Sequence, residues 1–157
     1  MHPMKPLLED HLLSDGRTIS YYSSREASSL PWLICFSGAG SDSFDWLLVL
    51  EELSSSANIL IVDKPGFLGT DPYNVALTQE QIAADVMAVC KKLNIHRAHF
   101  IGHSLGYLSA LIFAHHSKQT FETLSITSLD GVSFNPLSTE VIKQMAPKDS
   151  FFQRSIN

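Results

Sequence analysis

Apolar positions follow two alternating patterns along most of this chain. Four short runs are mostly apolar or β-branched, which is typical of strands buried in a sheet: 32–36, 58–62, 98–101 and 124–129. Three segments between them repeat apolar residues at helical spacing: 44–53, 79–93 and 105–116. Strands that alternate with helices predict an α/β fold, with a mostly parallel, doubly wound sheet flanked by helices.

Turn and cap residues mark where these elements begin. Asp15-Gly16 is a turn dipeptide between two β-prone runs, and it predicts a hairpin over 7–22. Thr78 is a candidate N-cap of the second helix, and the run 41–43 offers caps for the first. The predicted apolar side of the first helix consists of Phe44, Leu47, Leu48 and Leu50.

Composition narrows the class of protein. The 157 residues suffice for one domain with a core, and 45% hydrophobic against 17% charged residues is globular rather than disordered. A net charge of −5 argues against nucleic acid or an anionic membrane as the main partner. No apolar run reaches the length of a membrane span and no signal peptide is visible, so we expect a single cytoplasmic domain over 1–157.

The two cysteines, Cys35 and Cys90, fall inside a predicted strand and a predicted helix. Their spacing matches neither a metal site nor a C-x-x-C pair, so we expect two buried free thiols. Nothing else in the sequence suggests a metal or an organic cofactor, and we expect none.

The segment Gly102-His103-Ser104-Leu105-Gly106 reads G-x-S-x-G and lies between a predicted strand and a predicted helix. In that context the serine sits on a strained turn, with glycine on both sides because side chains there would collide with the neighbouring strand and helix. The helix that follows aims its N-terminal N–H groups at whatever the serine attacks. The motif therefore indicates a nucleophile elbow, with Ser104 as the candidate nucleophile.

Two further loops follow predicted strands, at the edge where parallel sheets place their chemistry. One is Phe36-Ser37-Gly38-Ala39-Gly40, and the other, 63–71, reads Asp-Lys-Pro-Gly-Phe-Leu-Gly-Thr-Asp. With the hairpin and the elbow, in this order, they resemble the N-terminal portion of the α/β-hydrolase fold superfamily, in its branch of small serine esterases and lipases. The resemblance runs from about Leu8 to Asn135, and it likens 36–40 to the family's oxyanion loop and 63–71 to its D-x-P-G-F-G-x-S-D loop.

The resemblance implies roles for four residues. Ser104 would be the nucleophile, and the backbone N–H groups of Leu105 and Ala39 would form the oxyanion hole. Asp130, which follows the last predicted strand, is a candidate for the acid of the triad. Its alternative is a turn residue paired with Gly131.

The sequence departs from the family pattern at three places. Ser37 replaces the usual histidine, which we expect to remove a side chain that braces the loop. Leu68 and Gly69 stand in exchanged order, so we expect their loop to turn differently. Tyr107 stands where a small residue is common, and we expect it to reshape the floor of the pocket.

The base that should activate the serine is missing from the pattern. A serine hydroxyl is a poor nucleophile until a base within roughly 2.6–3.2 Å takes its proton. Only His115 and His116 follow Ser104, and His115 would lie roughly 16 Å further along the helix. We expect structural or surface roles for five histidines, because geometry excludes them as the base: His96, His99, His103, His115 and His116. His2 and His11 match no position of the family.

Three hypotheses about function stay open. The first is a serine hydrolase that cleaves an ester, thioester or similar acyl bond of a small molecule through an acyl-enzyme, with its base in a longer protein or a complementing chain. The second is a catalytically incomplete binding module. The third is a truncated gene product with no function of its own, whose open sheet edge would invite aggregation or pairing with a complementing chain or an oligomer. Residues 136–157, with a candidate helix at 138–146, are either the first part of a lid or a frayed tail.

Overall fold

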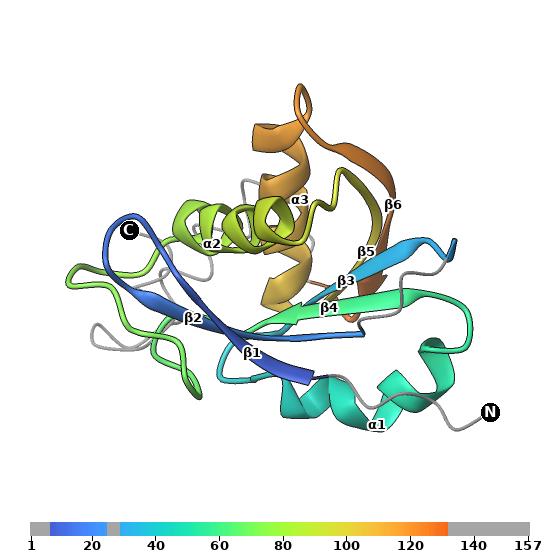
Figure 1. Ribbon diagram of the computed structural model, residues 1–157, viewed down its shortest axis with the longest axis horizontal. Coiled ribbons are helices and arrows are strands. Elements are labelled where there is room, and N and C mark those ends of the chain that lie inside the picture. Colours follow the sequence, from blue (N-terminus) through green and yellow to red (C-terminus); the bar gives the residue numbers. More distant parts are fainter. Residues whose placement is uncertain (1–6, 25–28, 132–157) are drawn as a thin grey trace.

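The computed structural model of the chain describes residues 7–24 and 29–131. The elements are β1 (Leu7–Leu12), β2 (Thr18–Ser23), β3 (Trp32–Phe36), α1 (Phe44–Leu53), β4 (Asn58–Val62), α2 (Gln79–Lys92), β5 (Arg97–His103), α3 (Leu105–Ser117) and β6 (Glu122–Leu129), as Figure 1 shows. The predicted hairpin, strands and helices are confirmed throughout this part of the chain. The predictions for 136–157, including the candidate helix at 138–146, lie outside the described residues, as does His2.

The described strands form one sheet in the order β1-β2-β4-β3-β5-β6. The β1–β2 hairpin joins β4 antiparallel, whereas β4, β3, β5 and β6 run parallel to one another. Gly16 closes the hairpin at φ +86°, a conformation that glycine adopts without a steric penalty. The predicted fold class, a mostly parallel α/β sheet, is therefore confirmed.

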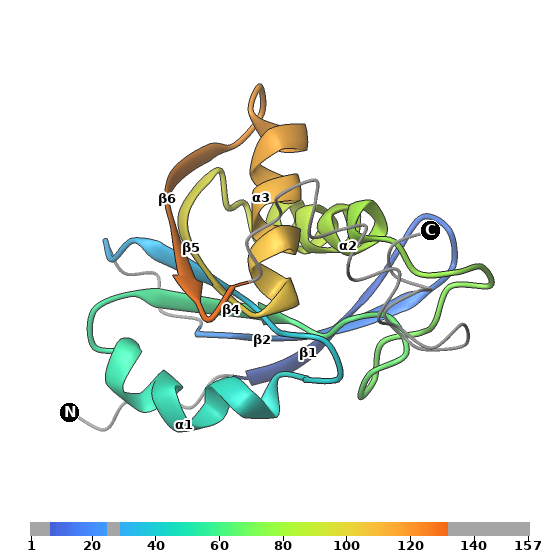
Figure 2. The ribbon, with the colours of Figure 1, turned by 180° about the vertical axis from the view of Figure 1, so that it is seen from behind.

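Helices cover both faces of this sheet. Figure 1 shows α1 against one face and α2 and α3 against the other, and Figure 2 shows the same arrangement from behind. Helices α2 and α3 also contact each other. The described residues thus form two separate hydrophobic clusters, one on each face.

The larger cluster lies between the sheet and the α2 and α3 helices, and aromatic rings form its centre. Phe100 of β5 is fully buried and meets Phe113 of α3 edge to face, with ring centroids 5.1 Å apart. Phe36 of β3 and Phe121 pack against the same two rings. Edge-to-face packing suits the ring quadrupoles, so these four phenylalanines join strands and helix with a preferred geometry.

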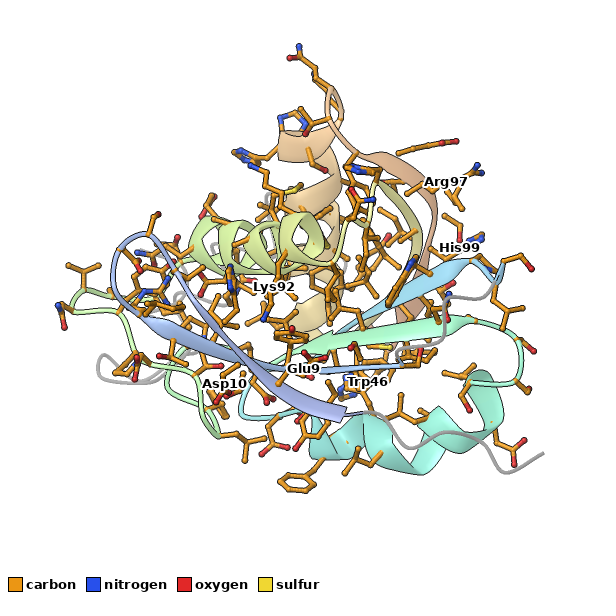
Figure 3. All side chains as sticks on the ribbon, in the orientation of Figure 1. Glu9, Asp10, Trp46, Lys92, Arg97 and His99 are labelled. Carbon is orange, nitrogen blue, oxygen red and sulfur yellow. The ribbon has the colours of Figure 1, made fainter. Side chains whose placement is uncertain are left out.

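The smaller cluster lies under α1, where the predicted apolar side is wrong at one position. Phe44 is 54% exposed, whereas Trp46 is 4% and Leu50 is 2% exposed. Figure 3 shows Trp46 reaching from α1 towards the sheet, where its Nε1 donates a hydrogen bond to the Ser37 hydroxyl at 2.9 Å. Residues four apart share a helix face, so burying Trp46 with Leu50 turns Phe44 outwards. A tryptophan at this site buries more apolar area than a phenylalanine and also satisfies its N–H group.

The helix caps differ in kind. Thr78 forms the predicted cap of α2: its hydroxyl accepts the Gln81 N–H, and the Gln81 side chain accepts the Thr78 N–H. Ser43 precedes α1 without a side-chain cap bond, and Asp42 takes that part by accepting the Phe44 N–H at 2.9 Å. The capping residue of α1 was thus among the predicted candidates.

Cys35 and Cys90 are free and buried, as predicted, one in each cluster. Burial raises the pKa of both thiols, that of Cys90 to about 12. Both are therefore protonated and packed as small apolar side chains. Within residues 7–24 and 29–131, no helix has the length and apolar character needed to cross a membrane.

Candidate active site

Three loops meet at the carboxyl edge of the parallel strands. Because β3 lies between β4 and β5, the loop after β3 has the loop after β4 on one side and the β5–α3 turn on the other. The register pairs Phe36 with Gly102, which brings the ends of β3 and β5 level. These are the three segments that the sequence singles out, at the edge where α/β sheets bind ligands.

Ser104 lies at the tip of the β5–α3 turn in a strained backbone conformation. Its φ is +50° and its ψ is −120°, a combination that is unfavourable for a residue with a Cβ. A Cβ on Gly102 would collide with the backbone of Tyr107, and one on Gly106 would collide with the Phe36 carbonyl. Only glycine fits on either side of Ser104, so the turn has the geometry that a nucleophile elbow requires.

The hydrogen bonds of the turn leave the serine hydroxyl free for chemistry within the described residues. The N–H of Ser104 donates to the Leu129 carbonyl at 2.9 Å, which ties the elbow to the end of β6. The carbonyl of Ser104 accepts the Tyr107 N–H, and its hydroxyl makes no cap bond to α3. Leu105 is the first residue of α3, where the N–H groups have no partner within the helix.

The loop after β3 lies against the elbow. A Cβ on Gly38 would be 3.3 Å from the Ser104 Cβ, so the loop backbone and the serine are in contact. The carbonyl of Gly38 accepts the Ser41 N–H at 3.3 Å, and Gly40 has φ +69°, as in a type II turn. Ala39 is half-buried at the corner of that turn.

Ser37 braces this loop, contrary to our expectation. Its hydroxyl donates to the Asp42 carbonyl at 3.1 Å while accepting the Trp46 N–H. The Ser37 hydroxyl links β3 to the start of α1, because it bonds both the Asp42 carbonyl and the indole of Trp46. Sequence patterns compare one position at a time, so they missed a brace built from two residues.

The loop after β4 contributes two buried charged residues. The Asp63 carboxylate accepts the Ser43 N–H at 3.1 Å, so Asp63 holds the start of α1 rather than only its own loop. Burial raises the pKa of Asp63, despite the opposing hydrogen bond from Ser43. The Lys64 amine donates to the Gly38 carbonyl, and burial lowers the pKa of Lys64 to about 8. Lys64 occupies the variable position of the D-x-P-G pattern, and so nothing in the sequence marked it.

The exchange of leucine and glycine at 68 and 69 places a leucine in a strained position, and the expectation that the loop turns differently stays a prediction. Leu68 adopts φ +46°, the left-handed conformation that glycine favours. A Cβ on Gly69 would collide with the Ser20 hydroxyl, so glycine is needed there for close approach to β2. The loop therefore carries backbone strain at Leu68.

Asp130 lies one residue beyond β6, beside the elbow. It is exposed with φ +50°, and the next N–H, of Gly131, donates to the Ser128 hydroxyl at 3.1 Å. The side chain of Tyr107 packs closely against Gly131, and its effect on the pocket floor stays a prediction. These features favour the turn reading of Asp130, and its role as the acid stays a prediction.

The described histidines lie away from the serine hydroxyl or bond elsewhere. His115 and His116 are exposed in the last turn of α3, with ring centroids 5.5 Å apart. His96 bonds the Asn94 side chain at 2.7 Å. His103 adjoins the serine but lies on the α1 side of the sheet, where it borders a cavity. Within the described residues, no hydrogen bond joins a histidine to Ser104.

A second serine does have a histidine partner. The hydroxyl of Ser125 on β6 lies 2.8 Å from His99 Nδ1 on β5. Figure 3 shows His99 on the right, below Arg97. Ser125 lies within β6, beside a register shift in the pairing with β5, and it does not adopt the positive φ of Ser104. The pair therefore lacks an arrangement of donors for an oxyanion, which makes Ser125 a natural control for Ser104.

A cavity of about 660 Å³ lies on the α1 side, below the elbow. Its wall is mostly apolar and includes Trp46, Ile101, His103 and Leu129. Among the described residues, no cluster of histidine, cysteine or carboxylate side chains is placed to hold a metal ion. The described residues bring a strained serine, the N-terminal N–H groups of α3 and the buried Lys64 to this edge.

Comparison with known proteins agrees with this geometry. The chain is 34% identical over 98 residues to RutD of Stutzerimonas stutzeri (strain A1501), which is named, provisionally, a carbamate hydrolase. That match covers 60% of this chain and 36% of RutD. The enol-lactonase from Burkholderia xenovorans LB400 is 25% identical with a TM-score of 0.66, over 73% of this chain and 44% of the lactonase.

The fold itself has a close counterpart in Cfl2 from Burkholderia cenocepacia. The TM-score is 0.75 at 18% identity, over 93% of this chain and 53% of Cfl2. The chain thus spans about half the length of these solved structures and about a third of RutD. The model of the alpha/beta hydrolase family matches residues 33–155, and the chain therefore belongs to the alpha/beta hydrolase family.

Proposed function

We propose that this chain carries the nucleophile and the oxyanion hole of a serine hydrolase, an enzyme that cleaves an ester, thioester or similar acyl bond of a small molecule. One observation carries the proposal: Ser104 is held at φ +50° between two glycines that nothing larger can replace. Such strain persists only where the surrounding structure imposes it, and it collects at functional sites. The lactonase and hydrolase names of the relatives agree with acyl chemistry.

The reaction follows from the placement of the groups. The Ser104 oxygen attacks the carbonyl carbon of the substrate, and a base takes the hydroxyl proton. The negative oxygen that results is stabilised by the N–H groups of Leu105 and Ala39. The bond to the leaving group then breaks to give an acyl-enzyme, which water hydrolyses to release the acid and restore the hydroxyl.

We place the base in a longer protein or in a complementing chain, because residues 132–157 contain no histidine. A histidine there would need to come within roughly 2.6–3.2 Å of the Ser104 hydroxyl. Asp130 is the described carboxylate nearest in sequence to the end of β6, and it is our candidate for the acid that orients such a histidine. The exposed β6 edge is where further chain would join the sheet.

A binding module is the second candidate function. The observation in its favour is that the described histidines leave Ser104 without a base. In that case the elbow and its loops would bind a carbonyl compound without cleaving it.

The test is covalent labelling of the folded chain with a fluorophosphonate, with the modified residue mapped by mass spectrometry. We expect label on Ser104, none in Ser104→Ala, and unchanged labelling in Ser125→Ala, whose serine has a histidine partner but no strained turn. Thermal unfolding of each variant confirms that it is folded. Label that survives in Ser104→Ala would sink the proposal, and a folded but unlabelled wild-type chain would favour the binding module.

A further inference from the structure

Among residues 7–24 and 29–131, Lys64 is the one lysine that is buried, and it lies at the candidate site. It is 7% exposed, and its amine bonds the Gly38 carbonyl while lying 4.6 Å from the centre of the Phe67 ring. Burying an ammonium is costly unless it is paired and hydrogen-bonded, so a lysine in this place calls for a reason. The reaction proposed above leaves it unused.

The bond to Gly38 determines the direction of a neighbouring N–H group. A trans peptide is planar, so the carbonyl of Gly38 and the N–H of Ala39, which share one peptide unit, point in opposite directions. Lys64 follows β4, and Ser104 follows β5, on the two sides of the β3 loop. With the carbonyl turned to Lys64, the N–H of Ala39 is turned to the side of Ser104.

We infer that Lys64 is a positioning residue for the oxyanion hole: its ammonium holds and polarises the Gly38–Ala39 peptide so that the Ala39 N–H faces the oxygen formed at Ser104. This inference rests on the function proposed above. The turn bond from Ser41 already holds the same carbonyl, at 3.3 Å, so Lys64 adds a charge-assisted bond to a weak one. A polarised peptide makes its own N–H a stronger donor.

The charge on Lys64 is set by its surroundings. Burial lowers its pKa to about 8, while three carboxylates act in the opposite direction: Asp42, Asp45 and Asp63. Asp42 belongs to the β3 loop, Asp45 to α1 and Asp63 to the end of β4. The His103 ring also approaches Gly38 from β5. The ammonium is therefore present below about pH 8 and is lost above it, and the orienting bond weakens with it.

The first experiment follows the peptide itself and needs no turnover. In chain labelled with carbonyl-¹³C glycine, the Gly38 resonance should move with a midpoint near pH 8. The movement should disappear in Lys64→Met and in Lys64→Arg, whose guanidinium keeps its proton in this range. A resonance that stays constant in the wild-type chain, or that still titrates in Lys64→Met, overturns the inference.

The second experiment follows the acylation of Ser104 by the fluorophosphonate. We expect Lys64→Met to slow labelling about 10-fold, less than the loss of a whole oxyanion donor, and Lys64→Arg to restore most of the rate. The ratio of wild-type to Lys64→Arg rates should fall above pH 8. The matched control is Lys92→Met, because the Lys92 amine also donates to a backbone carbonyl, that of Asp10, and lies over an aromatic ring.

The outcomes separate the two proposals. Equal labelling rates in Lys64→Met and Lys92→Met overturn the role of Lys64 while leaving Ser104 as the nucleophile. A folded wild-type chain without label favours the binding module over the hydrolase, and the glycine resonance still decides whether Lys64 controls the peptide.

Discussion

The two faces of the sheet are built differently, and β5 shows the difference within a single strand. Phe100 points to the α2–α3 side and is fully buried among three other phenylalanine rings. Its neighbour Ile101 points to the α1 side, is half-buried and borders a cavity. One face therefore holds the fold together, while the other, beyond α1, offers an apolar wall beside the candidate site.

Replacing these neighbours by alanine should produce the largest effect and the clearest contrast. Phe100→Ala should lower the free energy of unfolding by about 3–5 kcal/mol, because it removes the ring that joins β5 to α3. Ile101→Ala should lower it by about 1–2 kcal/mol, since less apolar area leaves water at that position. Urea unfolding followed by circular dichroism measures both.

Equal losses of stability in Phe100→Ala and Ile101→Ala would contradict the difference between the two faces. They would mean that the α1 side of β5 is as closely packed in solution as the α2–α3 side, through an oligomer or residues outside the described part. Measuring the sedimentation of the same samples would distinguish an oligomer from covering by the chain itself.

Most of the fold was accessible from the sequence because its signals are local. The apolar runs predict β3, β4 and β5, and the Asp15-Gly16 turn predicts the hairpin, with no need of tertiary information. The side of α1 that is buried was harder to predict. Phe44 fits helical spacing, but the hydrogen bond from Trp46 to Ser37 decides the orientation, and that bond joins two separate elements.

The candidate site was accessible only in its backbone features. The G-x-S-x-G pattern predicts the elbow because steric collisions at Gly102 and Gly106 exclude other residues. Lys64 was not accessible, since its meaning depends on Gly38, a residue of another loop. The conformation of Leu68 was not accessible either, because the loop as a whole imposes a positive φ that leucine itself disfavours.

Two ion pairs, one buried and one exposed, show a similar contrast between the α2 side of the sheet and the β5–β6 surface. Arg17 and Asp85 pair at 2.7 Å on the α2 side, with side chains 12% and 4% exposed, and the Tyr73 ring covers the guanidinium. Arg97 and Glu122 lie on adjacent strands at 3.6 Å, and both are about two-thirds exposed. Water and salt screen the second pair far more than the first.

Neutralising one partner of each pair should therefore give unequal losses. Asp85→Asn should lower the free energy of unfolding by about 3 kcal/mol, because it leaves a buried arginine with a weaker partner. Glu122→Gln should change it by less than about 0.5 kcal/mol, an effect that added salt should remove. A loss of several kcal/mol in Glu122→Gln would show that the β5–β6 surface is shielded from solvent.

The smallest expected change in stability is at the carboxyl edge of the parallel strands, where several residues have strained backbones. Leu68 and Ser104 both adopt positive φ there, but only Ser104 has a proposed chemical role. Leu68 is 50% exposed, so Leu68→Gly removes little packing. The substitution should raise the free energy of unfolding by about 0.5 kcal/mol, because the strain that it relieves exceeds the conformational entropy that glycine loses on folding. The control Leu12→Gly, at an exposed leucine within strand β1, should lower it by up to about 1 kcal/mol. Thermal unfolding shows whether each variant is more or less stable than the wild-type chain. A lower stability in Leu68→Gly would mean that the Leu68 side chain, and not the close approach of Gly69 to β2, holds the loop in place.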